Sequence, residues 1–437
     1  MRICPICTGN QVIDGAIRFD HGGLLFELNQ CLSCAHLFYV NTVEFNFRED
    51  FVHKRSIRGY IEKIADMEQT LSVVYNVLHE NPSWKLGTDI GCGVGIVMDF
   101  AFTMRQCRMI GFEPSPDYSE EGSNVLKLHV VPDYFDLKYL QGQYMDFATC
   151  FQVLQLVSDP LTFLQEIKRG LKEDGVLILS TPDNEKLKDD NAVSHYFSAF
   201  SPGVHRQLFS KESLQAALTS AGFTETAIFR YNGHLFALAG SKDLSDIDLF
   251  RLNPEVLTDY YIKKLRLLQP GSSYFNGFWY RLYRTKIDKG DYQDAFEMLT
   301  SVDWFDVWSA EEINAISKPE KLFELNTAAD GIIYYYTAIL FLNHLHRVEY
   351  AEKFFELSFY LCSKIIQLHP EVSTIEKDIV WLAKYHQILA LYYQGKTQQA
   401  NLEAYQLRYH QKEFYNHIDH PPHDLIEKVV NLQEKYR

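Results

Sequence analysis

A glycine-rich turn is the part of this sequence best suited to hold a small molecule. It reads Asp89-Ile-Gly-Cys-Gly-Val-Gly95 and begins at the end of a predicted strand, Trp84 to Ile90. Glycine adopts positive φ angles and lets a backbone approach a ligand closely. The helix that we expect from Ile96 leaves free N–H groups in its first turn. The pattern therefore predicts a binding site at the end of a strand, formed around Gly91, Gly93 and Gly95.

The acid before the first glycine separates two classes of cofactor. A dinucleotide fingerprint places its third glycine one residue later, and a pyrophosphate would avoid a carboxylate. S-adenosylmethionine has no phosphate but carries an ammonium group, which Asp89 can hold directly or through water. Glu113 ends the next predicted strand and can accept both ribose hydroxyls. Asp133 lies in a loop well placed to contact adenine. These acids predict S-adenosylmethionine as the cofactor.

Four of the eight cysteines form two Cys-x-x-Cys pairs, Cys4 with Cys7 and Cys31 with Cys34. Two such knuckles complete a tetrahedral site of four thiolates, which is typical of structural zinc. The segment between them alternates apolar and polar residues, as a small β-hairpin does. We predict a zinc ribbon over residues 1–45, with a redox pair or fortuitous spacing as the alternative. Because four thiolates are available, we expect His36 at the surface rather than on the metal.

Strand and helix patterns alternate around the turn, which predicts a parallel, doubly wound sheet with short loops. The last two strands are joined by Asn232-Gly233, a hairpin signal, and should end the sheet as an antiparallel pair. The predicted strands cover residues 84–90, 108–112, 127–131, 145–151, 176–180, 226–231 and 234–239.

Helical patterns occupy the segments on both sides of this α/β region. Apolar residues recur every three or four positions from Ser56 to Asn81, which predicts one connecting helix. We expect it to pack against the next domain, with a lid over the cofactor as the alternative. After Lys242 the strand signal disappears, and amphipathic stretches follow without the fixed period of a repeat. This helical domain is expected to bind a partner, mediate oligomerisation, close over the substrate or simply add stability.

The overall composition limits the partners. The chain has 437 residues and a net charge of −15. Such a chain does not attract phosphate backbones or anionic lipid, so nucleic acid is a disfavoured partner unless a local basic patch exists. No apolar run reaches the roughly 18 residues of a membrane span, and the first residues lack a signal-peptide pattern. We therefore expect a reducing, cytoplasmic location, where cysteines remain thiols or metal ligands. Cys92, inside the turn, is then a small buried side chain.

Residues 84–240 resemble class I S-adenosylmethionine-dependent methyltransferases, in particular a small-molecule- and glycan-modifying group with an N-terminal Cys-x-x-Cys…Cys-x-x-Cys module. The motifs that carry the resemblance are Asp89–Gly95, Glu113, Asp146–Pro160, Gly175–Pro182 and His205–Leu214, leading to Phe223. It implies a methyl donor held by Asp89, Gly91, Gly93, Glu113, Phe151 and Gln152. One departure is Gln155-Leu156, where the family usually has a Glu-His pair. It implies a different substrate or weakened activity.

Three residues are candidate bases for an acceptor that must lose a proton. His205 falls in the family-like His-x-x-x-Phe-Ser segment. His195 lies in an aromatic stretch that could wall a substrate pocket. Asp183 follows the fifth strand, beyond whose carboxyl end ligands bind. The alternative for each histidine is a packing or surface role, and for Asp183 a helix or turn cap. Many acceptors need no base, because the sulfonium is already activated and the enzyme mainly aligns the nucleophile.

These observations predict a Rossmann-like doubly wound methyltransferase sheet with an N-terminal zinc ribbon and a C-terminal all-helical domain. The expected boundaries are 1–45, 46–82, 83–242 and 243–437. The leading function is S-adenosylmethionine-dependent methylation of a small molecule or saccharide, such as a glycan precursor. One alternative is an RNA methyltransferase, although the ribbon has few basic residues. The other is a non-catalytic interaction protein with a vestigial methyltransferase fold, which Gln155-Leu156 alone supports.

Overall fold

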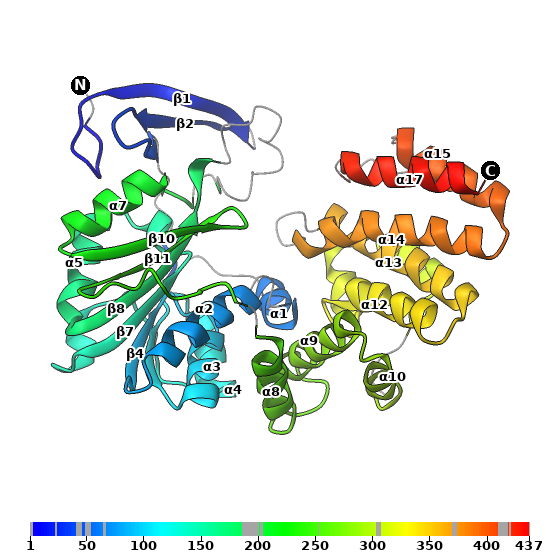
Figure 1. Ribbon diagram of the computed structural model, residues 1–437, viewed down its shortest axis with the longest axis horizontal. Helices are drawn as coiled ribbons and strands as arrows, with labels where there is room; N and C mark the ends of the chain where they lie inside the picture. The colour runs from blue at the N-terminus through cyan, green and yellow to red at the C-terminus, as the bar shows by residue number, and fades with distance from the viewer. Residues whose placement is uncertain are drawn as a thin grey trace. The chain divides into compact units, whose positions relative to one another are not determined.

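The computed structural model describes residues 3–21, 24–40, 46–48, 54–63, 67–185, 201, 204–251, 253–302, 307–368, 374–409, 418 and 421–436. It divides into two compact units. The first joins Met1–Val52 to Met67–Asn253, and the second joins His53–Asp66 to Pro254–Arg437 (Figure 1). Within these described ranges, no helix combines the length and the apolarity that a bilayer crossing requires.

A seven-stranded sheet forms the centre of the first unit, in the order β10-β11-β8-β7-β4-β5-β6 (Figure 1). The five strands from β8 to β6 run parallel, and β11 pairs antiparallel with both β8 and β10. The predicted doubly wound sheet with its terminal hairpin is thus confirmed. The strands are β4 (Leu86–Ile90), β5 (Arg108–Phe112), β6 (Val130–Val131), β7 (Met145–Phe151), β8 (Leu171–Pro182), β10 (Glu225–Tyr231) and β11 (His234–Gly240).

Helices connect these strands and bury them. Every residue from Met145 to Cys150 in β7 is buried, as expected for a central strand covered on both faces. Asp159 caps α5 by accepting from Thr162 N, and Ser210 caps α7 through a capping box. These caps satisfy backbone donors at the two helix starts. The helices are α2 (Met67–Glu80), α3 (Ile96–Arg105), α4 (Pro116–Val125), α5 (Pro160–Gly170) and α7 (Lys211–Ser220), with 3-10 turns η1 (Leu137–Leu140) and η2 (Leu154–Leu156).

The N-terminal module contributes three strands to a second, four-stranded sheet. β1 (Val12–His21), β2 (Leu24–Cys31) and β3 (Leu37–Tyr39) form an antiparallel meander. The fourth strand, β9 (Gln207–Leu208), comes from the segment before α7 and pairs with β3. Leu28, Leu37 and Leu208 are buried together in its small core. The module therefore shares its sheet with the methyltransferase-like region, which the sequence did not predict.

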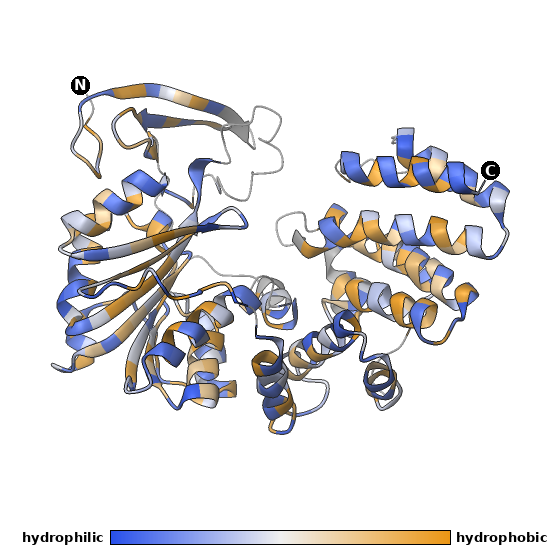
Figure 2. Ribbon diagram, viewed as in Figure 1, coloured by the Kyte–Doolittle hydropathy of each residue, from blue (hydrophilic) through white to orange (hydrophobic). Residues whose placement is uncertain are grey.

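The described part of the second unit is entirely helical. Figure 2 shows apolar residues along α12, α13 and α14, and their buried side chains form its main core. Its elements are α1 (Lys54–Lys63), α8 (Pro254–Leu265), α9 (Ser273–Lys289), α10 (Tyr292–Thr300), α11 (Ala310–Ala315), η4 (Pro319–Glu324), α12 (Asp330–Asn343), α13 (Val348–Leu368), α14 (Thr374–Tyr393), α15 (Thr397–Tyr409) and α17 (His423–Lys435).

The expected connecting helix is divided between the units. α1 belongs to the second unit and α2 to the first. Arg58 of α1 donates hydrogen bonds to the carbonyls of Leu325 (2.9 Å) and Asn326 (2.8 Å). A Cβ at Gly277 of α9 would lie 2.5 Å from Ile61 O, so this helix contact depends on glycine. Periodicity revealed an apolar face on each helix but not the unit against which that face packs.

Candidate functional site

The glycine-rich turn lies between β4 and α3 in a conformation that favours glycine. The φ angles are +71° at Gly91, +53° at Gly93 and +81° at Gly95. A Cβ at Gly91 would lie 2.3 Å from Val153 Cγ2, and one at Gly95 would lie 2.3 Å from Leu128 Cδ1. The positive φ angles disfavour larger residues at all three positions, and the close neighbours add a steric reason at Gly91 and Gly95.

Two buried carboxylates lie at the carboxyl ends of β4 and β5. Asp89 is 3% exposed and Glu113 is 8% exposed. Thr149 donates its hydroxyl to Asp89 Oδ1 at 2.7 Å, and Glu113 accepts the N–H groups of Gly93 (3.0 Å) and Ser115 (2.9 Å). Burial raises the pKa of both acids, that of Asp89 to about 7. Among the described residues neither acid forms an ion pair, so a bound cation would be a favourable partner.

A cavity of about 400 Å³ lies beside the turn, within the size range of small-molecule sites. Four of the predicted cofactor residues line it: Gly91, Glu113, Phe151 and Gln152. Most of the remaining wall is apolar and includes Phe47, Phe112, Phe135, Phe163 and Leu156. The structure thus brings together polar groups from three strand ends around an apolar space.

The other predicted cofactor residues lie outside the cavity lining. Asp89, Gly93 and Gly95 belong to the turn and its support. The Asp133 carboxylate accepts hydrogen bonds from Tyr139 OH (2.6 Å) and Tyr134 N (2.7 Å), and it pairs with Arg48. The Tyr139 hydrogen bond is the main cause that lowers the pKa of Asp133. Asp133 therefore orders its loop, while Tyr134 lines the cavity.

The candidate bases are not gathered at one point. Asp183 is ion-paired with Arg230 Nε at 2.9 Å and accepts the N–H of Glu185 at 3.0 Å. It therefore occupies the turn-capping position that was its structural alternative. His205 donates its backbone N–H to Ser201 O at 2.9 Å, and the residues on either side of it, Val204 and Arg206, line the cavity. His195 lies outside the described residues.

The departure at Gln155 is part of a buried amide network. Gln155 is 2% exposed. Its Nε2 donates to Gln152 Oε1 at 3.2 Å, and its Oε1 accepts the Thr181 hydroxyl at 3.2 Å. Gln152 Nε2 in turn contacts Ser180 Oγ at 3.0 Å and His234 Nδ1 at 3.2 Å. This network fixes Gln152, a residue of the cavity wall whose φ is +58°.

Arg206 and Phe47 are among the cavity residues that the sequence analysis missed. Arg206 brings a cation to the cavity wall, and Phe47 brings an aromatic ring from the segment after the N-terminal module. Arg206 lies in the family-like segment that pointed to His205, so that motif could have suggested it. Phe47 has no such signal, because neither periodicity nor a motif marks residues 46–48.

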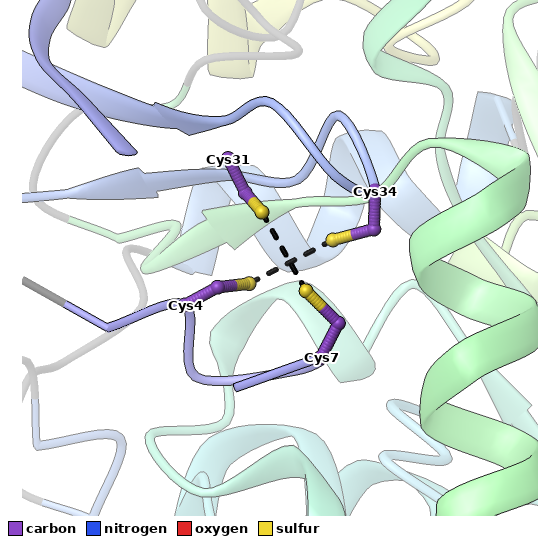
Figure 3. A group of neighbouring side chains, drawn as sticks. All are labelled: Cys4, Cys7, Cys31 and Cys34. Carbon is purple, nitrogen blue, oxygen red and sulfur yellow. Dashed lines mark hydrogen bonds between the residues drawn. The ribbon is translucent and has the colours of Figure 1, made fainter. Parts of the chain in front are cut away.

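The four predicted zinc ligands converge in the N-terminal module. Figure 3 shows the sulfurs of Cys4, Cys7, Cys31 and Cys34 pointing toward one another, and all four lie within 4.8 Å of each other. Cys4 Sγ is 3.7 Å from Cys34 Sγ, and Cys7 Sγ is 3.5 Å from Cys31 Sγ. Tetrahedral zinc with bonds of about 2.3 Å would separate its sulfurs by roughly 3.8 Å. The cluster therefore fits a zinc ion.

The expectation of a surface His36 was wrong. Its side chain is fully buried, packs against the tilted ring of Phe209 with ring centroids 4.8 Å apart, and contacts Gln207 Oε1 through Nε2 at 3.1 Å. Burial lowers the pKa of His36 to about 3, which keeps the ring neutral. The pairing of β3 with β9 buries His36, and no motif or periodicity indicates that pairing.

Comparison with known proteins identifies the central region. Residues 66–228 match the family of methyltransferase domains, so the chain carries a methyltransferase domain. The chain is 29% identical over 124 residues to a tRNA U34 carboxymethyltransferase from Campylobacter jejuni, covering 26% of this chain and 43% of that protein. It is 31% identical over 107 residues to a ubiquinone biosynthesis O-methyltransferase from Haemophilus ducreyi, covering 21% of this chain and 43% of that protein.

A solved structure is also similar to part of the chain, at lower identity. It is an S-adenosylmethionine-dependent methyltransferase from Thermotoga maritima, described as a possible histamine N-methyltransferase, with 22% identity and a TM-score of 0.33. The match covers 44% of this chain and 95% of that one. The chain spans less than half the length of the two curated relatives above.

Proposed function

We propose that this chain transfers a methyl group from S-adenosylmethionine to a small-molecule or saccharide acceptor, such as a glycan precursor. The observation that carries the proposal is the pair of buried carboxylates, Asp89 and Glu113, which lack a cationic partner among the described residues beside a glycine turn. A zwitterionic cofactor with an ammonium group and ribose hydroxyls supplies what these acids need.

Each part of the site has a role in this proposal. Glu113 and Gly91 form the wall where the ribose and the methionine part would lie, and Asp89 would hold the ammonium group directly or through water. Tyr134 and Phe135 offer aromatic surface to an adenine ring. When bound, the cofactor supplies a sulfonium-activated methyl group. The chain's own task is to bind the cofactor and the acceptor, to orient them and to exclude water, since alignment of the reactants accounts for much of methyl-transfer catalysis.

The remaining cavity suits a small acceptor. Its walls are mainly apolar and its volume is about 400 Å³. Nucleotide sugars, as glycan precursors of small size, are the first acceptors to test. The net charge of −15 also favours a small acceptor over a polyanion.

A second candidate is methylation of RNA. It is favoured by the sequence similarity to a protein named as a tRNA U34 carboxymethyltransferase. The acidic net charge opposes it. Tight RNA binding that weakens steeply with salt would make RNA the better proposal, because phosphate contacts release counterions.

We further propose that the four cysteines hold a structural zinc ion. A closed site of four thiolates leaves no open coordination position, so the metal would stabilise the module and take no part in methyl transfer. The module and the methyltransferase domain would then act in a reducing cellular compartment. The helical second unit is proposed to bind a partner or mediate oligomerisation.

Calorimetry with S-adenosylmethionine and S-adenosylhomocysteine on the full chain tests the donor site. We expect micromolar binding to the wild type, weakened about 10- to 100-fold in Asp89→Ala, since one charge-assisted contact is lost. Asp146→Ala is the matched control, because it removes a buried carboxylate that bonds Lys85 N and Lys172 at the opposite end of the sheet. Folded wild type that binds neither ligand would refute the proposal.

A further inference from the structure

The four-cysteine module is anchored to the methyltransferase domain beside the cavity. Leu37 and Phe38 of β3 pair with Leu208 and Gln207 of β9, and Tyr39 N donates to Arg206 O at 3.0 Å. The knuckle that contains Cys34 is held as well, since Ser210 Oγ donates to its carbonyl at 2.6 Å. The strand that leads from the cavity residue Arg206 to α7 is thus part of the module's sheet.

One side chain of this strand reaches both the module and the cavity wall. Gln207 is 3% exposed. Its Nε2 donates to Val157 O at 2.7 Å and to Leu154 O at 3.4 Å. Its Oε1 lies 3.1 Å from His36 Nε2 and must accept, because the amide nitrogen faces the two carbonyls. All three polar partners of this amide are therefore supplied by the module and by the loop after β7.

The loop held by Gln207 forms one side of the cavity. Val153, Leu156, Val157 and Ser158 all line it. Of the two bonded carbonyls, one belongs to the lining residue Val157 and the other to Leu154, which follows Val153 in the same turn. Arg206 N adds a hydrogen bond to Gln155 O at 2.8 Å. The loop's own bonds are few: Leu156 N donates to Val153 O at 2.8 Å and Val157 N to Leu154 O at 3.4 Å. Such a short turn depends on outside contacts to hold its shape.

We propose that Gln207 is a positioning residue that couples the four-cysteine module to the cavity wall at residues 153–158. It does not line the cavity itself. Its side chain links His36 to the carbonyls of Leu154 and Val157, and this link fixes the wall that a cofactor or acceptor would touch. The N-terminal module is then a part of the binding site's framework rather than a separate appendage. The expected effect on ligand binding rests on the proposed function, whereas the effect on the loop does not.

Asn184 provides a matched control. It is an equally buried amide, 3% exposed, and it also ties the module to the domain, because its Nδ2 donates to Ala35 O at 2.7 Å and to Leu208 O at 3.3 Å. Within the described part of the chain, it makes no hydrogen bond to residues 153–158. Asn184→Ala and Gln207→Ala therefore remove comparable buried amides, but only the second releases the loop.

The test is hydrogen exchange and calorimetry on the full-length wild type, Gln207→Ala and Asn184→Ala. We expect both variants to melt at lower temperature. Only Gln207→Ala should speed exchange of the Leu156 and Val157 amides, by about tenfold, because it removes the bonds that hold their turn. Only Gln207→Ala should weaken S-adenosylhomocysteine binding, by about three- to tenfold. If Gln207→Ala does not fold, Gln207→Met keeps the side chain's length and removes the same bonds.

The outcomes separate this proposal from the proposed function. Exchange at Leu156 and Val157 that is unchanged in both Gln207 variants, or raised equally by Asn184→Ala, would overturn the positioning role. Faster exchange in a folded Gln207 variant with undiminished ligand binding would also overturn it. A wild type that binds no S-adenosylhomocysteine would overturn the proposed function, and the exchange comparison would still decide whether Gln207 holds the loop.

Discussion

Replacement of Asp89 by asparagine should separate the cost of the buried carboxylate to folding stability from its contribution to ligand binding. Asparagine keeps an oxygen that can accept the Thr149 hydroxyl, bonded at 2.7 Å in the wild type, and it removes the charge. Burial, with a smaller contribution from the charge of Glu113, raises the pKa of Asp89 from 3.8 to about 7. At about 1.4 kcal/mol per pKa unit, the ionised carboxyl destabilises the ligand-free fold by roughly 4 kcal/mol at most.

The raised pKa of Asp89 determines how its effect on the free energy of unfolding changes with pH. The folded state holds the Asp89 proton more tightly than the unfolded chain does. Asp89 therefore lowers the free energy of unfolding by an amount that grows from about pH 4 to about pH 7 and stays constant above that. Asp89→Asn carries no such titration. We expect the variant and the wild type to have similar free energies of unfolding near pH 4, and the variant to be more stable by up to roughly 4 kcal/mol above pH 7.

The assay is native-state hydrogen exchange of the β4 and β7 amides across this pH range, because it measures the first unit alone. Asp146→Asn is the control with the opposite sign. Burial raises the pKa of Asp146, but hydrogen bonds from Lys172, Lys85 N and Leu86 N outweigh it and hold the pKa below its ordinary value. Its loss should therefore destabilise the unit at neutral pH. Asp89→Asn that is less stable than wild type at pH 8 would refute the reasoning.

The same substitution should weaken ligand binding. An ammonium group favours the ionised carboxyl, so wild-type affinity for S-adenosylhomocysteine should rise as the pH passes through about 7. Asp89→Asn should bind about 10- to 100-fold more weakly at pH 8 and lose this pH dependence. Calorimetry at several pH values measures both effects. Equal affinity of the two proteins at pH 8 would show that the Asp89 charge does not serve the ligand.

Three further predictions follow from the contacts. Cys34→Ser should reduce bound zinc below the wild-type content and lower the melting temperature, as metal analysis and calorimetry would show; an unchanged metal content would contradict the proposed site. Gly91→Ala places a Cβ 2.3 Å from a neighbouring side chain and should weaken S-adenosylhomocysteine binding more than tenfold, whereas Gly142→Ala, also at positive φ but in open space, should not. Lys63→Met strips Glu376, fully buried and 2.5 Å from Lys63, of its cation and should cost the second unit about 3–5 kcal/mol in urea unfolding; a neutral result would contradict a buried ion pair.

The glycine-rich turn was predictable because its signal is local. Asp89, the three glycines and Ile96 stand within eight positions, and each has a physical reason that holds before any tertiary contact is known. The parallel, doubly wound sheet followed from alternating strand and helix patterns, and its antiparallel end followed from a hairpin signal. The four thiolates converged as expected, since their spacing alone defines two knuckles.

The features that were missed depend on contacts between segments that lie far apart in the sequence. β9 is two residues long and joins β3 across about 170 positions of sequence, so no periodicity marks it. The burial of His36 and the bridging role of Gln207 follow from that pairing. The placement of α1 was missed for a similar reason, because an apolar helix face does not indicate which unit it covers. Local sequence reasoning therefore predicted the side of the cavity at the glycine-rich turn, but it missed the side that β9 holds in place at residues 153–158.

The amide at Gln155 gives a last prediction about how this site works. Its Nε2 donates to Gln152 Oε1 while its Oε1 accepts from Thr181. An ionised glutamate, which the resemblance would place here, cannot donate, and it would turn a second oxygen toward the Gln152 oxygen. We therefore expect Gln155→Glu to lower stability and weaken S-adenosylhomocysteine binding, rather than to restore a lost activity. Calorimetry and a methyl-transfer assay on both proteins measure this. A glutamate variant that binds as tightly as wild type and transfers methyl groups faster would show that Gln155 weakens this site, and that its amide network is dispensable.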